Sequence, residues 1–326
     1  MNNFITVAYF AKQQPPRNHK ITARFSFQFL KVIFVTMIEN LREKIVFGPI
    51  KSRRLGVSLG INILPTEMKI CNFNCIYCEC GWNSNDENIC SENKKFPNKN
   101  EIKTQLENKL SELCKNNEQI DTITFSGNGE PTLHPDFLEI INDTVEIRNK
   151  FFRALNGATV KITVLSNATN LLNKNIFEGL KKIENPILKL DSANPETILK
   201  INLPSKEIPH QVRYDCKTVI ADLTRNPLTT KVSLEKIVDG MKQFNGNFIL
   251  QIMFLRGEID GQIVDNTTAE EVSGLIEIMK ITKPRQVMIY GIDRKTPAKN
   301  LIKLSSEEMQ KIAAKIEAAG FNVLYV

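Results

Sequence analysis

Short apolar runs alternate with longer amphipathic segments along most of this 326-residue chain. The runs are rich in Ile, Val, Leu and Phe and show no clean alternation of apolar and polar positions. Strands covered on both faces have this pattern, so we expect a parallel β-sheet packed against helices, an α/β fold. The expected strands are Val57–Ile63, Thr122–Ser126, Val160–Ser166, Ile187–Asp191, Phe248–Phe254, Gln286–Tyr290 and Phe321–Tyr325.

Between these runs, apolar residues recur every three or four positions, as they do on one face of a helix. The clearest sets are Ile102, Leu106, Leu110, Leu113 and Cys114, and then Val272, Leu275, Ile276 and Met279. Thr268 and Glu271 have the spacing of a capping box before the second set. Ser305 and Glu308 have the same spacing before a last helix, for which Gly320 is a plausible stop.

The alternation of six or more such units favours a partial (β/α)6 barrel of the TIM type with parallel strands. A doubly wound open sheet is the alternative. Residues 192–231 interrupt the alternation with four prolines and no sustained helical face. An insertion of that length in a compact domain is usually a lid or binding loop, or disordered.

The composition is that of an ordinary soluble protein, with 24% charged and 42% hydrophobic residues. No segment approaches the ~18 apolar residues of a membrane span, and we expect a cytoplasmic protein. The net charge of +7 is concentrated in residues 1–36, which carry five basic residues and no Asp or Glu. The rest of the chain carries only +2, so charge gives weak support for nucleic-acid binding.

The acid-free segment 1–36 contains Pro15 and Pro16 and ends in an apolar stretch. It has the character of an amphipathic transit peptide or of an extension from an over-extended start site. We favour the second interpretation and expect a disordered or non-native extension over residues 1–36. The barrel domain is then expected over residues 37–326.

Four of the seven cysteines fall within ten residues: Cys71, Cys75, Cys78 and Cys80. The first three have the spacing C-x3-C-x2-C. Three thiolates on one short loop can hold three irons of a cubane iron–sulfur cluster, whereas a fully protein-ligated cluster has four cysteines. The missing ligand leaves one iron open for chemistry.

Two other uses of these cysteines remain open. A structural zinc site prefers two separated C-x2-C pairs, but the remaining cysteines, Cys90, Cys114 and Cys216, are solitary. A disulfide framework suits small secreted domains, whereas this chain is long and has an odd cysteine count.

The expected strand ends gather the other candidate residues. In parallel barrels the active site lies at the carboxyl ends of the strands. The cysteine loop follows the first expected strand, and polar or glycine-containing segments follow the others: 126–132, 166–169, 189–191, 254–257 and 290–294.

The cysteine loop, with Tyr77 just before its third cysteine, resembles the signature loop of the radical S-adenosylmethionine (SAM) superfamily. The run 128–131, Asn-Gly-Glu-Pro, stands where that family has a Gly-Gly-Glu-Pro element. The runs 47–62 and 292–297 are similar to one subgroup, the stand-alone Fe–S oxidoreductases grouped with tRNA wyosine synthases and molybdenum-cofactor cyclases. The resemblance covers roughly residues 46–300, with its motifs in the family's order.

The resemblance implies a radical SAM enzyme in which Cys71, Cys75 and Cys78 bind three irons of a [4Fe–4S] cluster. The open iron would take the amino and carboxylate groups of SAM. An electron from the reduced cluster would break a carbon–sulfur bond, and the 5′-deoxyadenosyl radical would abstract a hydrogen from an unknown substrate. A low-potential donor such as flavodoxin or ferredoxin would supply the electron, and no membrane partner is expected.

The resemblance also implies contacts with SAM. Gly129 and Glu130 are expected near its ammonium group, because a closely approaching backbone and an anionic acceptor both suit a cation. Ser166 and Asn167 are candidates for the ribose or carboxylate of SAM. Tyr77 would lie beside the adenine.

Arg53 or Arg54 could bind an anionic substrate or the SAM carboxylate, or form ion pairs at the barrel rim. Most of the other candidates have structural alternatives too. The glycine-rich loop suits a tight turn, and Ser166 with Asn167 suits a helix N-cap. Asp191 would also suit a cap, and His134 a surface turn. Cys80 is read as a loop cysteine, because a fourth ligand would block the SAM site.

Two departures from the family's pattern, and several rival functions, bear on the assignment. Asn128 replaces the first glycine of the family's pair. Asn tolerates the left-handed backbone conformation, so we expect this replacement to alter only the turn. Wyosine synthases are expected to have cysteines upstream of the signature loop, and none precedes Cys71. The rivals are a tRNA-base-modifying enzyme, a glycyl-radical activase, and a non-catalytic Fe–S electron-transfer or zinc protein.

Overall fold

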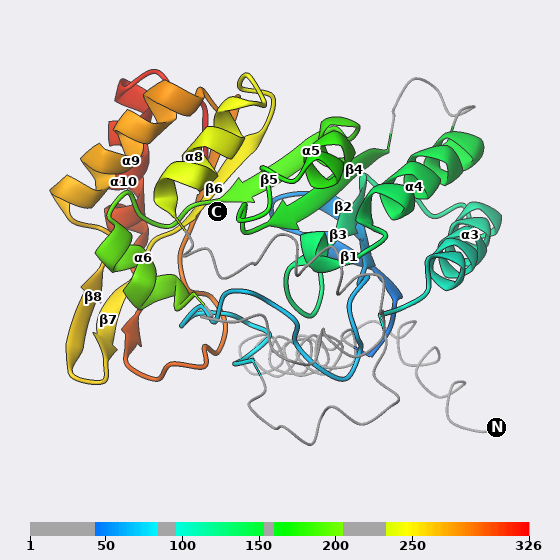
Figure 1. The fold of residues 1–326 in the computed structure, drawn as a ribbon, viewed down its shortest axis with the longest axis horizontal. Helices are drawn as coiled ribbons and strands as arrows, with labels where there is room; N and C mark the ends of the chain where they lie inside the picture. Colours follow the sequence, from blue (N-terminus) through cyan, green and yellow to red (C-terminus); the bar gives the residue numbers. More distant parts are fainter. Residues whose placement is uncertain (1–42, 84–95, 153–159, 205–232, 326) are drawn as a thin grey trace, which may run out of the picture. The chain divides into compact units, whose positions relative to one another are not determined.

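The computed structural model describes residues 43–83, 96–152, 160–204 and 233–325 (Figure 1). They belong to one compact unit, Arg42–Val326. The extension expected over residues 1–36 lies outside the described residues, so it and the boundary at residue 37 stay predictions. Within the described part of the chain, no helix has the length and apolar character needed to cross a membrane.

The main sheet has eight strands and curls into a partial barrel (Figure 1). The strands from β2 to β11 run parallel, whereas β1 is antiparallel to β2. This architecture confirms the predicted partial barrel, and each expected strand lies within two residues of an observed one. The spatial order is β1 (Val46–Ser52), β2 (Gly56–Ile61), β3 (Thr122–Phe125), β4 (Lys161–Ser166), β5 (Asn185–Lys189), β6 (Ile249–Met253), β9 (Gln286–Tyr290) and β11 (Val323–Tyr325).

Both faces of this sheet bury apolar side chains. Phe125 and Val164 belong to the main core, which they share with the apolar faces of the helices. Ile187, Ile249 and Met288 form a separate buried cluster. Because successive residues of a strand point to opposite faces, this second cluster lines the interior of the barrel. Burial on both faces explains why the strands lack an apolar–polar alternation.

Helices cover the outer face of the sheet (Figure 1). The last of them begins with the predicted capping box, since Ser305 and Glu308 exchange hydrogen bonds. At the start of α9 (Ala269–Thr282), Thr268 accepts the Glu271 N–H as predicted, but the Glu271 carboxylate instead accepts from Ser192 Oγ at 2.6 Å. The helices are α3 (Lys99–Lys115), α4 (Phe137–Phe152), α5 (Lys174–Lys181), α8 (Leu234–Lys242), α9 (Ala269–Thr282) and α10 (Ser306–Ala318).

Several strands were not predicted. They are β1 and a three-stranded sheet of β10 (Leu301–Ile302), β7 (Arg256–Ile259) and β8 (Gln262–Asp265). The hairpin of β7 and β8 turns at Asp260 and Gly261, which have φ angles of +49° and +76°. Only one residue of its strands, Val264, is fully buried, and Ile263 is 78% exposed, so the strands contain no buried apolar run. The Asp-Gly pair was the available signal for this hairpin.

The segment 192–231 contains a helix, contrary to the prediction. Helix α6 spans Pro195–Asn202, with Asn194 as its N-cap and proline in its first turn. Ile198 and Ile201 are buried. A helix of eight residues shows too few apolar repeats to be recognised by periodicity. The prediction for residues 205–231 lies outside the described residues.

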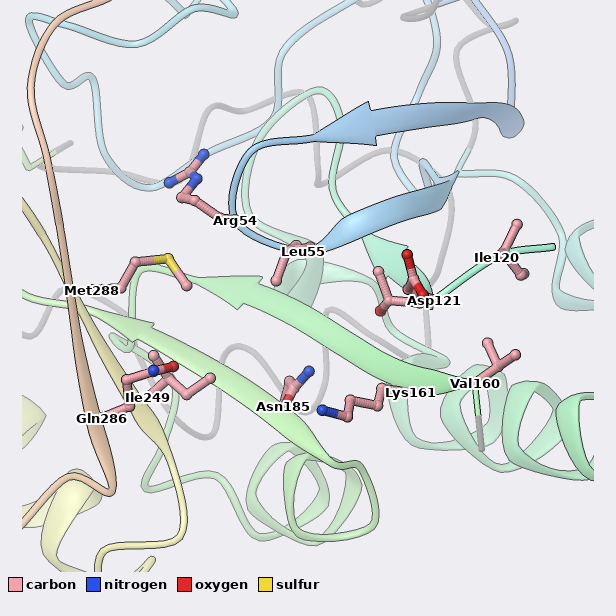
Figure 2. Close-up of a pocket in the computed structure, with 11 residues that line it drawn as sticks. Arg54, Leu55, Ile120, Asp121, Val160, Lys161, Asn185, Ile249, Gln286 and Met288 are labelled. Carbon is pink, nitrogen blue, oxygen red and sulfur yellow. The ribbon is translucent and has the colours of Figure 1, made fainter. Parts of the chain in front are cut away.

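The two ends of the barrel differ. At the amino ends of the strands lies a cavity of about 330 Å³, lined by Arg54, Asp121, Lys161 and Met288 among others (Figure 2). The cysteine loop lies at the opposite, carboxyl ends, where barrel enzymes carry their active sites. The site is therefore built from the carboxyl ends. The cavity is connected to the barrel interior, because Met288 in its lining belongs to the interior apolar cluster and Arg54 in its lining contacts the Tyr290 ring.

Candidate active site

The cysteine loop is held by backbone hydrogen bonds on two sides. On one side, the Ile70 N–H donates to the carbonyl of Asn128 at 2.8 Å. On the other, the Ile76 N–H donates to the carbonyl of Ile201, in α6, at 3.0 Å. The loop is thereby fixed between the turn after β3 and the unpredicted helix.

Gly129 allows the first of these attachments. It forms a parallel bridge with Ile70, and a Cβ atom at Gly129 would lie 1.8 Å from the Ile70 carbonyl oxygen. Its φ of +133° is also a conformation that side chains disfavour. The close backbone approach expected of this glycine thus serves the cysteine loop itself.

The three candidate iron ligands are free thiols. The Cys71 sulfur accepts a hydrogen bond from the Phe73 N–H at 3.4 Å, and the Cys75 sulfur accepts one from Asn202 Nδ2 at 3.3 Å. Hydrogen bonds to sulfur tune iron–sulfur ligands. Among the described residues, no three His, Cys, Asp or Glu side chains form a group that could hold a single metal ion. A cubane cluster differs from such a site, because each cysteine binds a different iron.

The thiols differ in acidity. Burial raises the pKa of Cys71 and of Cys75 above the ordinary thiol value. A hydrogen bond with Cys80 lowers the pKa of Cys78 to about 5. Since metal ligands must be thiolates, Cys71 and Cys75 would release protons on binding iron. Cys80 also donates to the Gly127 carbonyl at 3.0 Å.

Glu130 is 2% exposed, and its carboxylate accepts four hydrogen bonds. One oxygen accepts from Thr132 Oγ1 at 2.6 Å, from the Thr132 N–H at 3.1 Å and from Ser166 Oγ at 2.9 Å. The other accepts from the Asn167 N–H at 2.7 Å. Burial raises the pKa of Glu130, against the opposing effect of these bonds. The structure thus brings Glu130, Ser166 and Asn167 together, and their assignment to SAM stays a prediction.

Asn167 connects this carboxylate to the cysteine loop. Its Nδ2 donates to Asn72 Oδ1 at 2.6 Å and lies 3.8 Å from the Cys71 sulfur. The N-cap alternative for Ser166 and Asn167 is wrong, because α5 is capped by Asn173.

Asp191 is a second buried carboxylate next to the loop. It accepts hydrogen bonds from the Tyr77 hydroxyl, from Asn202 Nδ2 at 2.8 Å and from the Met253 N–H at 2.9 Å. The cap reading of Asp191 is wrong, since Asn194 caps α6. Sequence reasoning missed Asn202 because it lies on the unpredicted helix.

Lys189 lies two residues before Asp191 and therefore on the same inner face of the barrel. Its ammonium donates to the Tyr290 hydroxyl and lies 4.3 Å from the centre of the Tyr77 ring. Burial opposes its charge, but Asp191 and Tyr290 outweigh that effect and raise the pKa of Lys189. The two-residue spacing of Lys189 and Asp191 was the signal that they share a face.

The two arginines of the β1–β2 turn differ. Arg53 forms an exposed ion pair with Asp293 at 2.8 Å, as its structural alternative predicts. Arg54 instead places its guanidinium carbon 4.7 Å from the centre of the Tyr290 ring.

His134 is not the surface residue considered from the sequence. It is 3% exposed, its Nδ1 accepts the Asp136 N–H at 3.0 Å, and its Nε2 lies 3.1 Å from the Pro97 carbonyl. Both ring nitrogens are engaged, so its role is structural.

The chain matches one known protein family over most of the residues that form this site. Residues 68–266 match the family model described as the radical SAM superfamily. The chain therefore belongs to the radical SAM superfamily, whose members bind a [4Fe–4S] cluster and SAM. The matched range contains the cysteine loop and both buried carboxylates.

Sequence relatives cover the chain more widely. It is 29% identical over 283 residues to a protein named GTPase Obg from Brachyspira hyodysenteriae, a match covering 86% of this chain and 34% of that protein. It is 28% identical over 280 residues to a UPF0026 protein of Helicobacter pylori, covering 86% and 75%. The chain thus spans about a third of the first relative and three quarters of the second.

Solved structures share the fold. SuiB of Streptococcus suis bound to S-adenosylmethionine has a TM-score of 0.51 at 13% identity, covering 95% of this chain and 57% of that one. A structure of TYW1 with a lysine–pyruvate adduct bound has a TM-score of 0.50 at 14% identity, covering 89% of each chain. At these identities the likeness shows the fold alone.

Proposed function

We propose that this radical SAM enzyme holds its [4Fe–4S] cluster on Cys71, Cys75 and Cys78, cleaves SAM reductively and uses the 5′-deoxyadenosyl radical to take a hydrogen atom from a substrate. The observation that carries the proposal is the backbone pairing of Ile70 with Gly129. It attaches the loop with the three cysteines to the carboxyl ends of the strands, where barrel enzymes carry their active sites.

The surroundings of the cysteines suit a cluster with one open iron. The Phe73 N–H and the Asn202 amide direct donors at two of the sulfurs, and such bonds stabilise thiolate ligands. Cys80 donates to the Gly127 carbonyl, so we leave it out of the ligand set. Three ligands leave the fourth iron to SAM.

We assign Gly129, Glu130, Ser166, Asn167 and Tyr77 to the SAM side of the site. The carboxylate of Glu130 lies next to the cysteine loop, and its negative charge would attract the ammonium group of SAM. Its hydrogen bonds fix Ser166 and Asn167, so these three side chains would act as one unit.

Modification of a tRNA base is the second candidate. This candidate rests on the similarity of the runs 47–62 and 292–297 to the subgroup that includes tRNA wyosine synthases, and the likeness to TYW1 adds only the shared fold. The small charge outside residues 1–36 and the lack of cysteines before Cys71 favour another substrate. Under either candidate, a low-potential donor of the flavodoxin or ferredoxin type would supply the electron.

The test is the formation of 5′-deoxyadenosine by the anaerobically reconstituted full chain, with dithionite and SAM. We expect the wild-type protein to form it and the Cys75→Ala variant to lose it, together with its iron. The matched control is Cys114→Ala, which removes an exposed free thiol on α3 and should behave as wild type.

Two results would count against the proposal. One is an intact cluster that yields no 5′-deoxyadenosine. The other is a Cys75→Ala protein that still forms it at the rate of the Cys114→Ala control.

A further inference from the structure

Lys189 and Arg54 each lie near the ring of Tyr290, and the proposed cluster and SAM contacts use none of these three residues. We propose that Lys189 and Arg54 form an anion-binding subsite that takes a carboxylate or phosphate group of the substrate. This inference rests on the proposed function, because it concerns the substrate of the same site.

The charge of Lys189 is only partly matched by its neighbours. A lysine ammonium has three N–H donors, and among the described residues Lys189 uses one of them in a hydrogen bond, to the Tyr290 hydroxyl. The nearest carboxylate oxygen, on Asp191, is 4.0 Å away. That carboxylate is already held by donors from Tyr77, Asn202 and Met253.

The remaining contacts of Lys189 are with aromatic rings. Its ammonium lies 4.3 Å from the Tyr77 centroid and 5.1 Å from that of Tyr290. Rings stabilise a cation without using its N–H donors as a carboxylate would. The side chain is 18% exposed, so it is not completely enclosed.

Arg54 adds a second cation beside the same tyrosine. Its guanidinium carbon lies 4.7 Å from the Tyr290 centroid. No carboxylate among the described residues lies within ion-pair distance of Arg54, whereas its neighbour Arg53 pairs with Asp293 at 2.8 Å. The planar fork of a guanidinium suits carboxylate and phosphate. Two partly matched cations around one ring therefore favour an anion.

The position of the pair suits a substrate in the barrel interior. On the inner face of β5, Ile187 comes before Lys189 and belongs to the apolar cluster with Ile249 and Met288. Asp191 comes after Lys189 and touches Tyr77 of the cysteine loop. A substrate anchored at Lys189 would thus have the apolar cluster on one side and the cysteine loop on the other.

The carboxylate of SAM is the competing source of an anion. The family resemblance places that group on the open iron, which leaves Lys189 and Arg54 for a second anion. The reacting carbon would then belong to a molecule with its own negative group.

The test is calorimetric titration of the reconstituted full chain, with SAM present and no reductant, using inorganic phosphate and acetate as probes. We expect saturable binding of at least one probe to wild type. Lys189→Met and Arg54→Gln should each weaken it about tenfold or more, since each removes a charge-assisted bond. Lys189→Arg should restore it, and Lys150→Met, which removes an exposed lysine on α4, is the matched control.

Iron content and the thermal midpoint check that each variant is folded. Arg54 is partly exposed in the turn between β1 and β2, so Arg54→Gln carries the test alone when Lys189→Met does not fold. Three results overturn the inference: no saturable binding to wild type, equal binding to wild type and both charge-removing variants, or loss of SAM binding with phosphate and acetate binding unchanged. No SAM is cleaved in this assay, so its result is independent of 5′-deoxyadenosine formation. The protein can form 5′-deoxyadenosine without binding the anion probes, or bind them without forming 5′-deoxyadenosine.

Discussion

At the residue scale, the two buried carboxylates of the site depend on donors from separate parts of the chain. Glu130 accepts from Thr132, Ser166 and Asn167, and so joins the ends of β3 and β4. Asp191 accepts from Tyr77 and from Asn202 on α6. Because a buried donor without an acceptor is costly, replacing either acid affects several elements at once.

Glu130→Gln should reveal this coupling. The new amide N–H would face a former donor, and we expect the free energy of unfolding to fall by about 1–3 kcal/mol. Urea unfolding measures this, and titration of the reconstituted protein should show weaker SAM binding. The control, Glu317→Gln, changes an exposed acid on α10 and should shift stability by less than about 0.5 kcal/mol. An equal effect of the two substitutions would contradict the account of Glu130.

Gly129→Ala tests the close approach to Ile70. The added Cβ would clash with a carbonyl oxygen at 1.8 Å, so we expect the loop to detach and iron content to fall sharply. Gly261→Ala is the matched control, because it also has a positive φ, +76°, but has nothing within 4 Å of the added atom. It should cost only the backbone strain, about 1–2 kcal/mol, and keep its iron. Normal iron content in Gly129→Ala would refute the role of the bridge.

At the element scale, α6 and the β7–β8 hairpin mark what the periodicity of apolar residues could not predict. Both are too short, and the hairpin too exposed, to show a periodic apolar face. Yet α6 supplies Asn202, which touches Cys75 and Asp191. The longer elements α3, α9 and α10 were predictable because each buries a full stripe of apolar residues.

The start of α10 offers a pH-dependent test at this scale. Hydrogen bonds from Ser305, and then the contact with Arg256, lower the pKa of Glu308 from 4.5 to about 2. When the pKa of a carboxyl group is lower in the folded protein than in the unfolded chain, the carboxylate stabilises the fold at every pH above the unfolded-state pKa. This stabilisation is lost as the pH falls through the folded-state pKa. The difference in unfolding free energy between wild type and Glu308→Gln should therefore be constant near neutral pH. It should become smaller as the pH falls from 4.5 to about 2.

Urea midpoints of both proteins across that range give the measurement. A difference that stays constant down to the lowest pH would show that the charge of Glu308 does not matter. Ser305→Ala, which removes the cap itself, should cost about 1 kcal/mol at neutral pH.

At the scale of the whole molecule, the sequence predicts the barrel and the location of its chemistry better than the contacts within the site. Parallel strands put their carboxyl ends on one edge, so residues after successive strands had to meet there. Which of them touch depends on side-chain packing across that edge. Ser166 and Asn167 were assigned to SAM, but their hydrogen bonds to Glu130 were not foreseen, and Lys189 was not singled out.

Removal of the cluster should destabilise the cysteine loop and α6 more than the barrel. A group that binds only the folded protein stabilises it, so the chelator-treated protein should melt at a lower temperature than the reconstituted one. Hydrogen exchange should rise first at the amides of Ile70 and Ile76, which attach the loop. Uniform exchange throughout the sheet would contradict this local view.

The central claim is a cluster on three cysteines whose open iron takes SAM. The most direct measurement is the electron paramagnetic resonance spectrum of the dithionite-reduced, reconstituted protein with and without SAM. We predict a reduced [4Fe–4S] signal that changes when SAM is added and is absent from Cys75→Ala. A cluster spectrum that SAM leaves unaltered, or a preparation that binds zinc in place of iron, would contradict the claim.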